Sequence, residues 1–126
     1  LFAKIKRKQK IIFGLPGNPI SSSACFRFFV YPYLQESLGV ELDKPIKGIL
    51  KNNFIKKFNF TRFVKSRINT TKNGKLEVEI LKGQESYKIR SLIKSNTWAL
   101  LPSGKSKFKK GDILDCYFLN HVNKIF

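Results

Sequence analysis

The stretch Ile11-Ile12-Phe13-Gly14-Leu15-Pro16-Gly17-Asn18-Pro19-Ile20-Ser21-Ser22-Ser23 places a strand end, a turn and a helix start in one short run. Residues 11–13 are apolar and β-favouring, which predicts a buried strand. Asn18 is a preferred N-cap residue, and Pro19 suits the first helical position because its missing N–H costs nothing there. The run therefore predicts a strand, a tight turn and a helix, which together make half of an α/β unit.

The same turn has the outline of an anion site. Backbone N–H groups at a helix start and the positive end of the helix dipole attract oxyanions such as phosphate. Ser21 adds a hydroxyl beside them. The run lacks the Gly-Lys-Ser/Thr ending of a nucleotide P-loop and is not the dinucleotide fingerprint. From the spacing alone, an ordinary strand-to-helix turn is the preferred interpretation.

Composition indicates a folded chain rather than a disordered one. The 126 residues are 42% hydrophobic and include 12 phenylalanines, which is ample for a core. No apolar run reaches membrane-spanning length, so we expect no membrane partner and a cytoplasmic setting. Cys25 and Cys116 lie far apart without metal-like neighbours, which predicts small buried hydrophobes. Because the chain starts at Leu1 and contains no methionine, we expect it to be the C-terminal part of a longer protein.

The net charge of +17 brings nucleic acid into consideration as a partner. Lysine outnumbers arginine, however, and it occurs together with abundant isoleucine, asparagine and phenylalanine. A/T-rich codons encode this set, so genome composition explains much of the charge. The lysines are also scattered, and a charge run is usually a solvated face. We therefore keep nucleic-acid binding as an alternative and do not expect nucleic acid as the main partner.

The pattern of elements changes near Pro45. Before it, we expect one helix from residue 19 to about 31 that Pro32 interrupts and Gly39 ends. After it, turn signals separate short β-patterned runs, including an Asn73-Gly74 hairpin signal. These predicted strands cover residues 48–51, 60–68, 75–82, 87–93, 97–101 and 113–119. The sequence predicts a small antiparallel β-barrel or sandwich in residues 45–126, preceded by an α/β segment in residues 1–44.

Residues 14–21 read Gly-Leu-Pro-Gly-Asn-Pro-Ile-Ser and resemble the G-L-P-G-N-P-V-S signature of the molybdopterin molybdotransferase family, the MoeA and gephyrin C-terminal group. They differ from it by one conservative change. Phe60-Thr61-Arg62 resembles the family's F-x-R segment, and residues 83–96 resemble its G-x-x-S-x-x-x-x-S-x-x-x-x-N stretch. The closing L-P and G-D/E-x-V elements are matched near residues 101 and 111.

This resemblance implies a fold and an activity. Residues 1–44 would be the end of a molybdopterin-binding α/β domain, and residues 45–126 would be the C-terminal β-barrel domain. The whole enzyme would be a homodimeric transferase. It would insert molybdate into adenylylated molybdopterin, with Mg²⁺-dependent release of AMP, in molybdenum cofactor biosynthesis. The Mg²⁺ ligands and catalytic carboxylates would lie upstream, so this chain would contain no catalytic or metal-binding residue and would be inactive alone.

The resemblance also implies site residues. Those that would contact molybdate or molybdopterin are Gly14, Pro16, Gly17, Asn18, Pro19 and Ser21. Possible cleft residues from the barrel are Arg62, Ser86, Ser91 and Asn96. Lys56 and Lys57 stand where the family often has Gly-Arg, so Lys57 keeps a cation but loses the bidentate guanidinium fork. Glu85 adds a negative charge where a small residue is common.

Two alternatives of other classes stay open. One is a basic β-barrel that binds RNA or single-stranded DNA by stacking bases on exposed aromatic rings. Phe63, Trp98, Tyr117 and Phe118 instead occupy strand patterns that predict buried or half-buried side chains. The other is a peptide-binding scaffold, since the corresponding region of gephyrin also binds receptor peptides. His121, the single histidine, lies near the chain end and is predicted to be exposed.

Overall fold

The structure is a computed structural model that describes residues 2–119, so His121 lies outside the described residues. The chain forms two compact units, Leu1–Leu42 and Asp43–Phe126. Among the helices that the structure describes, none combines the length and hydrophobicity needed to cross a membrane.

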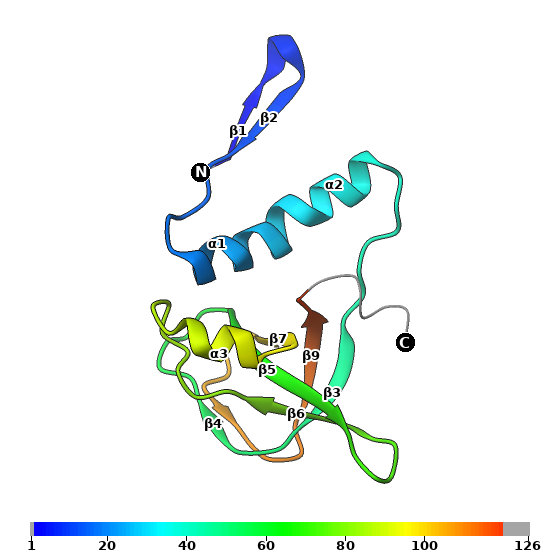
Figure 1. The fold of residues 1–126 in the computed structure, drawn as a ribbon, viewed down its shortest axis with the longest axis vertical. Helices are drawn as coiled ribbons and strands as arrows, with labels where there is room; N and C mark the ends of the chain where they lie inside the picture. Colours follow the sequence, from blue (N-terminus) through cyan, green and yellow to red (C-terminus); the bar gives the residue numbers. More distant parts are fainter. Residues whose placement is uncertain (1, 120–126) are drawn as a thin grey trace. The chain divides into compact units, whose positions relative to one another are not determined.

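The first unit begins with a two-stranded antiparallel sheet (Figure 1). Strand β1 (Phe2–Ile5) pairs with β2 (Lys10–Phe13), and Phe2 lies opposite Phe13. The predicted strand at residues 11–13 is therefore present, but the prediction that it is buried is wrong. Ile12 is 49% exposed. The physical reason is that β2 pairs only with β1, so this ribbon belongs to no larger sheet within its unit.

The helical segment that follows is interrupted before Pro32. Helix α1 (Pro19–Cys25) leads into a π-helical turn (Phe26–Val30) and then helix α2 (Tyr31–Ser37). Proline has no N–H and its ring collides with the carbonyl four residues back, so a wider turn accommodates it. The interruption thus lies in the turn before Pro32, and Gly39 ends the segment in the left-handed region at φ 66°.

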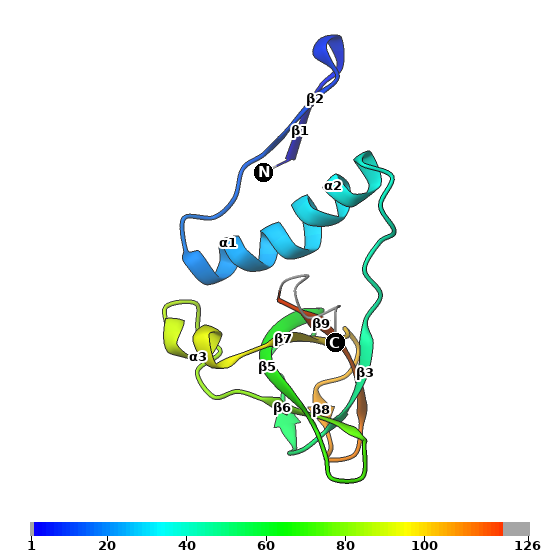
Figure 2. The same cartoon turned by 45° about the vertical axis from the view of Figure 1, so that its right-hand side comes forward.

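The second unit is a small β-rich domain built on a closed five-stranded barrel (Figures 1 and 2). Its strands follow the order β3-β6-β5-β7-β9 around the barrel. Their bounds are Ile46–Leu50 for β3, Arg62–Thr70 for β5, Leu76–Ile80 for β6, Thr97–Leu101 for β7 and Ile113–Phe118 for β9. Neighbours are antiparallel except β3 and β6, which are parallel. The predicted antiparallel barrel is therefore wrong at one pair of strands. Closure of the barrel places β3 beside β6, and these two strands run in the same direction.

Side chains from all five strands fill the barrel. Val64, Val78 and Leu101 are completely buried. The predicted alternation in residues 76–80 is confirmed by the burial of Val78 between less buried Glu77 and Glu79. The rest of the buried cluster consists of Leu50, Ile68, Ala99, Phe108, Leu114 and Cys116. Phe108 belongs to a short pair, β4 (Phe54–Ile55) with β8 (Lys107–Phe108), that the sequence did not predict.

The predicted hairpin at Asn73-Gly74 is confirmed. Strands β5 and β6 pair antiparallel with Thr70 opposite Leu76. The backbone N–H of Thr71 donates to the carbonyl of Lys75 at 2.8 Å, and Gly74 takes φ 76°. A side chain rarely adopts that angle, which is why glycine follows asparagine in this turn.

The predicted strand at residues 87–93 is wrong, because this segment forms helix α3 (Ile89–Lys94), drawn in yellow in Figure 1. Its apolar-polar alternation suggests a strand, but the same residues also place Ile89 and Ile93 four apart on a helix. The closed barrel decides between the two. Strand β5 is already paired on both sides, with β6 and β7, so no barrel edge is open to another strand.

Cys116 is completely buried on β9, and Cys25 is half-buried; both are free thiols. Burial, with a smaller contribution from Asp115, raises the pKa of the Cys116 thiol from 9.0 to about 12. Above pH 9 the unfolded thiol ionises while the folded one stays protonated, so this group's contribution to stability falls between pH 9 and pH 12.

We therefore predict a pH-dependent difference between the wild-type chain and its Cys116→Ala variant. From pH 7 to pH 10, the stability advantage of the wild type should shrink by about 1.4 kcal/mol. Urea unfolding of both proteins at the two pH values measures it, and other titrating groups cancel in the difference. An advantage that stays constant with pH would show that the folded thiol ionises as readily as the unfolded one.

Candidate functional site

The loop at residues 14–18 leads from β2 into a capped helix. The Asn18 side-chain Oδ1 accepts hydrogen bonds from the backbone N–H groups of Ile20 at 3.1 Å and Ser21 at 3.3 Å. The Asn18 carbonyl also accepts from the Ser22 N–H at 2.8 Å. The predicted N-cap is thus confirmed. The cap uses two of the N–H groups that a bound oxyanion would otherwise take, which leaves hydroxyls and loop amides as donors toward a ligand.

Glycine is not required by the backbone at Gly17. Its φ lies outside the left-handed region, and a Cβ added there would meet no atom within 4 Å. Gly17 and Pro19 are exposed, whereas Asn18 and Ser21 are half-buried. Four of the six motif residues proposed from the resemblance therefore lie together at the start of α1.

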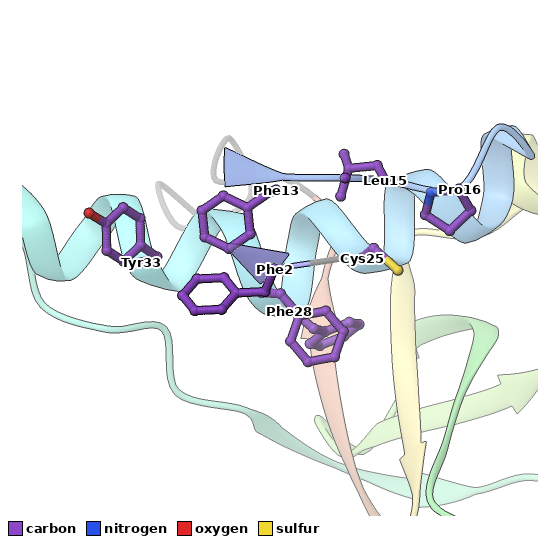
Figure 3. Close-up of a pocket in the computed structure, with 9 residues that line it drawn as sticks. Phe2, Phe13, Leu15, Pro16, Cys25, Phe28 and Tyr33 are labelled. Carbon is purple, nitrogen blue, oxygen red and sulfur yellow. The ribbon is translucent and has the colours of Figure 1, made fainter. Parts of the chain in front are cut away.

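The other two motif residues, Gly14 and Pro16, line an apolar cavity of about 730 Å³ in the same unit (Figure 3). Aromatic rings dominate it: Phe13 lies 5.4 Å from Phe2 and 5.5 Å from Tyr33 between ring centroids. The remaining lining residues are Leu15, Cys25, Phe28 and Phe29. Among the residues that the structure describes, no charged side chain lines this cavity, so its chemistry suits apolar or aromatic groups and not a molybdate or phosphate oxyanion.

A second hollow lies on the barrel unit and includes Arg62; we call it the Arg62 groove. It has a volume of about 590 Å³ and is bounded by β4, the start of β5, the end of β6 and residues 81–85. Its cationic side chains are Lys57, Arg62 and Lys82. Two carboxylates, Glu79 and Glu85, also line it. The groove therefore offers mixed charge with a small positive excess, and Arg62 is the group in it that can grip an oxyanion in bidentate fashion.

The other three barrel candidates differ in what their side chains do. Ser86 is exposed on the turn next to Glu85. Ser91 is buried on α3, where its hydroxyl donates to the carbonyls of Gly83 and Lys88, both at 2.7 Å. Asn96 donates to the Ile68 carbonyl at 2.9 Å and accepts from the Ile68 N–H at 2.8 Å. Ser91 and Asn96 thus act within the barrel unit, holding a loop and extending a strand ladder.

Two buried lysines were missed by the sequence reasoning. Lys65 is 1% exposed, and its ammonium donates to the carbonyls of Gly83 at 2.7 Å, Glu85 at 3.2 Å and Lys88 at 3.4 Å. Lys56 is 2% exposed and donates to the carbonyls of Phe60 and Pro102. Lysine is normally exposed, so its type gives no signal of burial; the signal available for Lys65 was its place beside Val64 in a long strand.

Three charged side chains beside the Arg62 groove, those of Lys65, Glu85 and Lys88, shift one another's pKa values. Burial lowers the pKa of Lys65, and the nearby Glu85 carboxylate opposes that shift. The pKa of Glu85 is itself lowered, mainly by its own backbone N–H and then by Lys88. Lys88 Nζ lies 3.1 Å from Glu85 Oε1, and this pair raises the pKa of Lys88. The charge of Glu85 is thus balanced locally by a neighbouring lysine.

The aromatic side chains considered for stacking with nucleic-acid bases are not exposed. Trp98 is 2% exposed, and Phe63, Tyr117 and Phe118 are half-buried, as their strand patterns predict. An exposed pair that the sequence did not single out is Phe58 and Phe60, whose rings stack 5.6 Å apart.

Comparison with known proteins places this architecture in a family. Residues 47–119 match the family described as MoeA C-terminal region (domain IV), so the chain belongs to that family. The molybdopterin molybdenumtransferase of Staphylococcus epidermidis is 32% identical over 108 residues, which cover 84% of this chain and 26% of that protein. That of Bacillus subtilis is 30% identical over 115 residues, 90% of this chain and 26% of that protein.

A solved structure, a molybdopterin biosynthesis moeA protein from Pyrococcus horikoshii OT3, has the same fold. The TM-score is 0.67 at 23% identity, and the likeness covers 81% of this chain and 26% of that one. The chain spans about a quarter of the length of the curated relatives it matches. Since the second unit begins at Asp43, an alignment over 108 residues extends into the first unit as well.

Proposed function

We propose that this chain is the C-terminal part of a molybdopterin molybdotransferase. In the complete enzyme, molybdate would be inserted into adenylylated molybdopterin and AMP would be released. The observation that carries the proposal is the likeness to molybdopterin molybdenumtransferases, which extends beyond the barrel family match into the unit that holds residues 14–21. If an unrelated protein merely contained a barrel of this family, the sequence similarity would not extend into the first unit.

The two units would have different parts in that enzyme. We propose that residues 1–44 end the molybdopterin-binding α/β domain and that residues 45–126 form the C-terminal barrel domain. Exposed apolar side chains in the first unit support this, since Phe2, Phe29 and Leu38 are each more than half exposed. Burying such groups against further protein is favourable. A homodimer in the cytoplasm is part of the same proposal.

The residues that would hold the substrate follow from the site geometry. At the start of α1, the Asn18 side chain already occupies two backbone N–H groups. The groups that would donate to an oxyanion are therefore the Ser21 hydroxyl and the backbone N–H groups of the loop at Gly17. On the barrel, Arg62 would grip a molybdate or phosphate oxygen pair, and Lys57 would add a point charge nearby. Gly14 and Pro16 would instead border the flat ring system of the ligand, because their cavity is lined by aromatic rings on which such rings stack.

Magnesium does not fit the residues that the structure describes. Within residues 2–119 there is no group of three or more His, Cys, Asp or Glu side chains that could hold a metal ion. Mg²⁺ prefers several oxygen ligands, carboxylates among them. The Mg²⁺ ligands would therefore come from the remainder of the enzyme.

A chimera tests the proposal. Residues 1–126 would replace the corresponding quarter of the Bacillus subtilis relative, and AMP release from adenylylated molybdopterin would be followed with and without molybdate. We expect molybdate-dependent release, and we expect Arg62→Gln to lower kcat/KM by about ten-fold or more, which is about 1.4 kcal/mol of transition-state stabilisation. Arg67→Gln, an exposed change on the same strand, should stay within about two-fold. A folded chimera without AMP release would overturn the proposal and make RNA binding the next function to measure.

A further inference from the structure

A third hollow, which shares Lys82 and Gly83 with the Arg62 groove, lies between the segment after β6 and helix α3. We call it the basic hollow. Its volume is about 480 Å³, and within the described part of the chain its lining includes four cationic side chains and no acidic one. The cations are Lys82, Lys88, Arg90 and Lys94. Hollows that concentrate one sign of charge focus the electrostatic field and raise the local concentration of counter-ions.

The cations of the basic hollow repel one another unless an anion is present. Arg90 and Lys94 are four residues apart on α3, so they extend from the same side of the helix. Lys88 is paired with Glu85. Within residues 2–119, no ion pair is found for Lys82, Arg90 or Lys94. A multivalent anion would therefore remove repulsion between these three groups as well as gain attraction to each.

Hydrogen bonds from two buried side chains hold the backbone that carries these cations. The buried ammonium of Lys65 ties the carbonyls of Gly83, Glu85 and Lys88 together. From the other side, the Ser91 hydroxyl bonds the first and last of these carbonyls. Gly83 itself takes φ 79° and lies against Lys88, where an added Cβ would come within 3.1 Å of that side chain. Because the loop and helix are tied to each other, the backbone that carries the cations needs little reorganisation when a ligand binds.

The ligand chemistry follows from charge density and shape. A single carboxylate cannot reach several dispersed cations, whereas two adjacent phosphate groups place several oxygens and about three negative charges in a small volume. Arginine adds a bidentate donor fork that matches phosphate geometry. Tyr87, which is 73% exposed and has Lys88 Nζ 5.8 Å from its ring centroid, adds an aromatic ring to the lining.

We propose that the basic hollow is a binding site for a ligand that carries two adjacent phosphate groups, held by Lys82, Lys88, Arg90 and Lys94. The site does not depend on the molybdotransferase proposal, because binding to this hollow requires neither molybdate nor turnover. The same groups would accept a soluble diphosphate compound or the headgroup of a multiply phosphorylated lipid.

The test uses the 126-residue chain labelled with ¹⁵N and titrated with inorganic pyrophosphate at 0.15 M salt, a concentration that screens long-range attraction. We expect saturable shifts of the amides in residues 82–94. The paired variant Arg90→Gln/Lys94→Gln should weaken binding about ten-fold or more. Its matched control is Lys72→Gln/Lys75→Gln, which removes the same charge from the exposed β5–β6 turn and should leave the affinity within about two-fold.

Two results would overturn the site. One is a titration without saturation, and the other is an equal loss of affinity in both paired variants, which would reflect the +17 charge of the whole chain. Vesicles of neutral phosphatidylcholine with and without a phosphoinositide distinguish the source of the phosphate groups. Tighter binding to phosphoinositide vesicles than to pyrophosphate, lost in Arg90→Gln/Lys94→Gln, would assign the hollow to a lipid headgroup.

Discussion

Replacing Lys65 with methionine should lower the free energy of unfolding by about 2 to 3 kcal/mol. Methionine has a similar length but no ammonium, so three backbone carbonyl oxygens lose a charged donor. Replacing a whole buried polar network with apolar groups is sometimes neutral, because both partners disappear together. Here the acceptors are backbone groups that keep one other donor each, the Ser91 hydroxyl for Gly83 and Lys88 and the Lys88 N–H for Glu85. The cost is therefore the loss of three charge-assisted hydrogen bonds, which makes the change destabilising.

The Lys65→Met change should also act locally. The Gln84 side chain still bonds the Lys65 backbone, since its amide donates to the Lys65 carbonyl at 2.8 Å and its oxygen accepts from the Lys65 N–H at 2.9 Å. We therefore expect the loop to remain attached at Gln84 while amide hydrogen exchange accelerates around residues 83–88.

Urea unfolding and hydrogen exchange measure both effects. The control is Arg67→Met on the same strand, where the side chain is exposed and a cost within about 0.5 kcal/mol is expected. If Lys65→Met costs no more than this control, the ammonium is not a structural anchor. Pyrophosphate titration of Lys65→Met adds a further readout, because loosening the loop should weaken the basic hollow without removing any of its four cations.

Replacing Gly48 with valine should destabilise the barrel by about 2 to 3 kcal/mol. Gly48 lies on β3 opposite Leu114 of β9, and its backbone faces the barrel interior. A Cβ at this position would lie 3.1 Å from Ile68 Cδ1 and 3.1 Å from both Cβ and Cγ1 of Val78. The Cβ of Val78 belongs to a β-branched residue on a paired strand, so it cannot move aside cheaply.

A double-mutant cycle separates steric overlap from other effects of losing glycine. Gly48→Ala and Val78→Ala should each be destabilising alone, and the double variant should cost less than their sum because Val78→Ala removes two methyl groups from the crowded space. Thermal or urea unfolding of the four proteins gives the coupling. Strict additivity would mean that Gly48 is not required for packing and that its replacement acts through the backbone.

Part of the candidate site was predictable because its signals are local. The N-cap at Asn18 depends on a side chain that reaches the backbone two and three residues ahead, so the sequence alone indicated it correctly. The sequence did not show one effect of this cap. In the structure, the Asn18 side chain occupies two backbone N–H groups that a bound oxyanion would need. Arg62 was singled out by resemblance, but its groove with Lys57 and Glu85 joins segments distant in the sequence.

By itself, the sequence determined the elements whose cause lies within a few residues. These are the break before Pro32, the helix end at Gly39, the turn at Gly74 and the alternation around Val78. Each follows from a backbone angle, a missing N–H or a side-chain period, all of which act over one or two turns of chain.

Tertiary structure alone decided the elements whose cause is long-range. Residues 89–94 form a helix because barrel closure leaves no edge for the strand that their pattern suggested. Lys65 is buried because residues 83–88 fold over it and supply three carbonyl oxygens, which offset the cost of removing an ammonium from water. The parallel pairing of β3 with β6 has the same origin, since closure brings together strands far apart in the sequence. Such contacts depend on the partners that the fold supplies, and the residues' own types do not encode them.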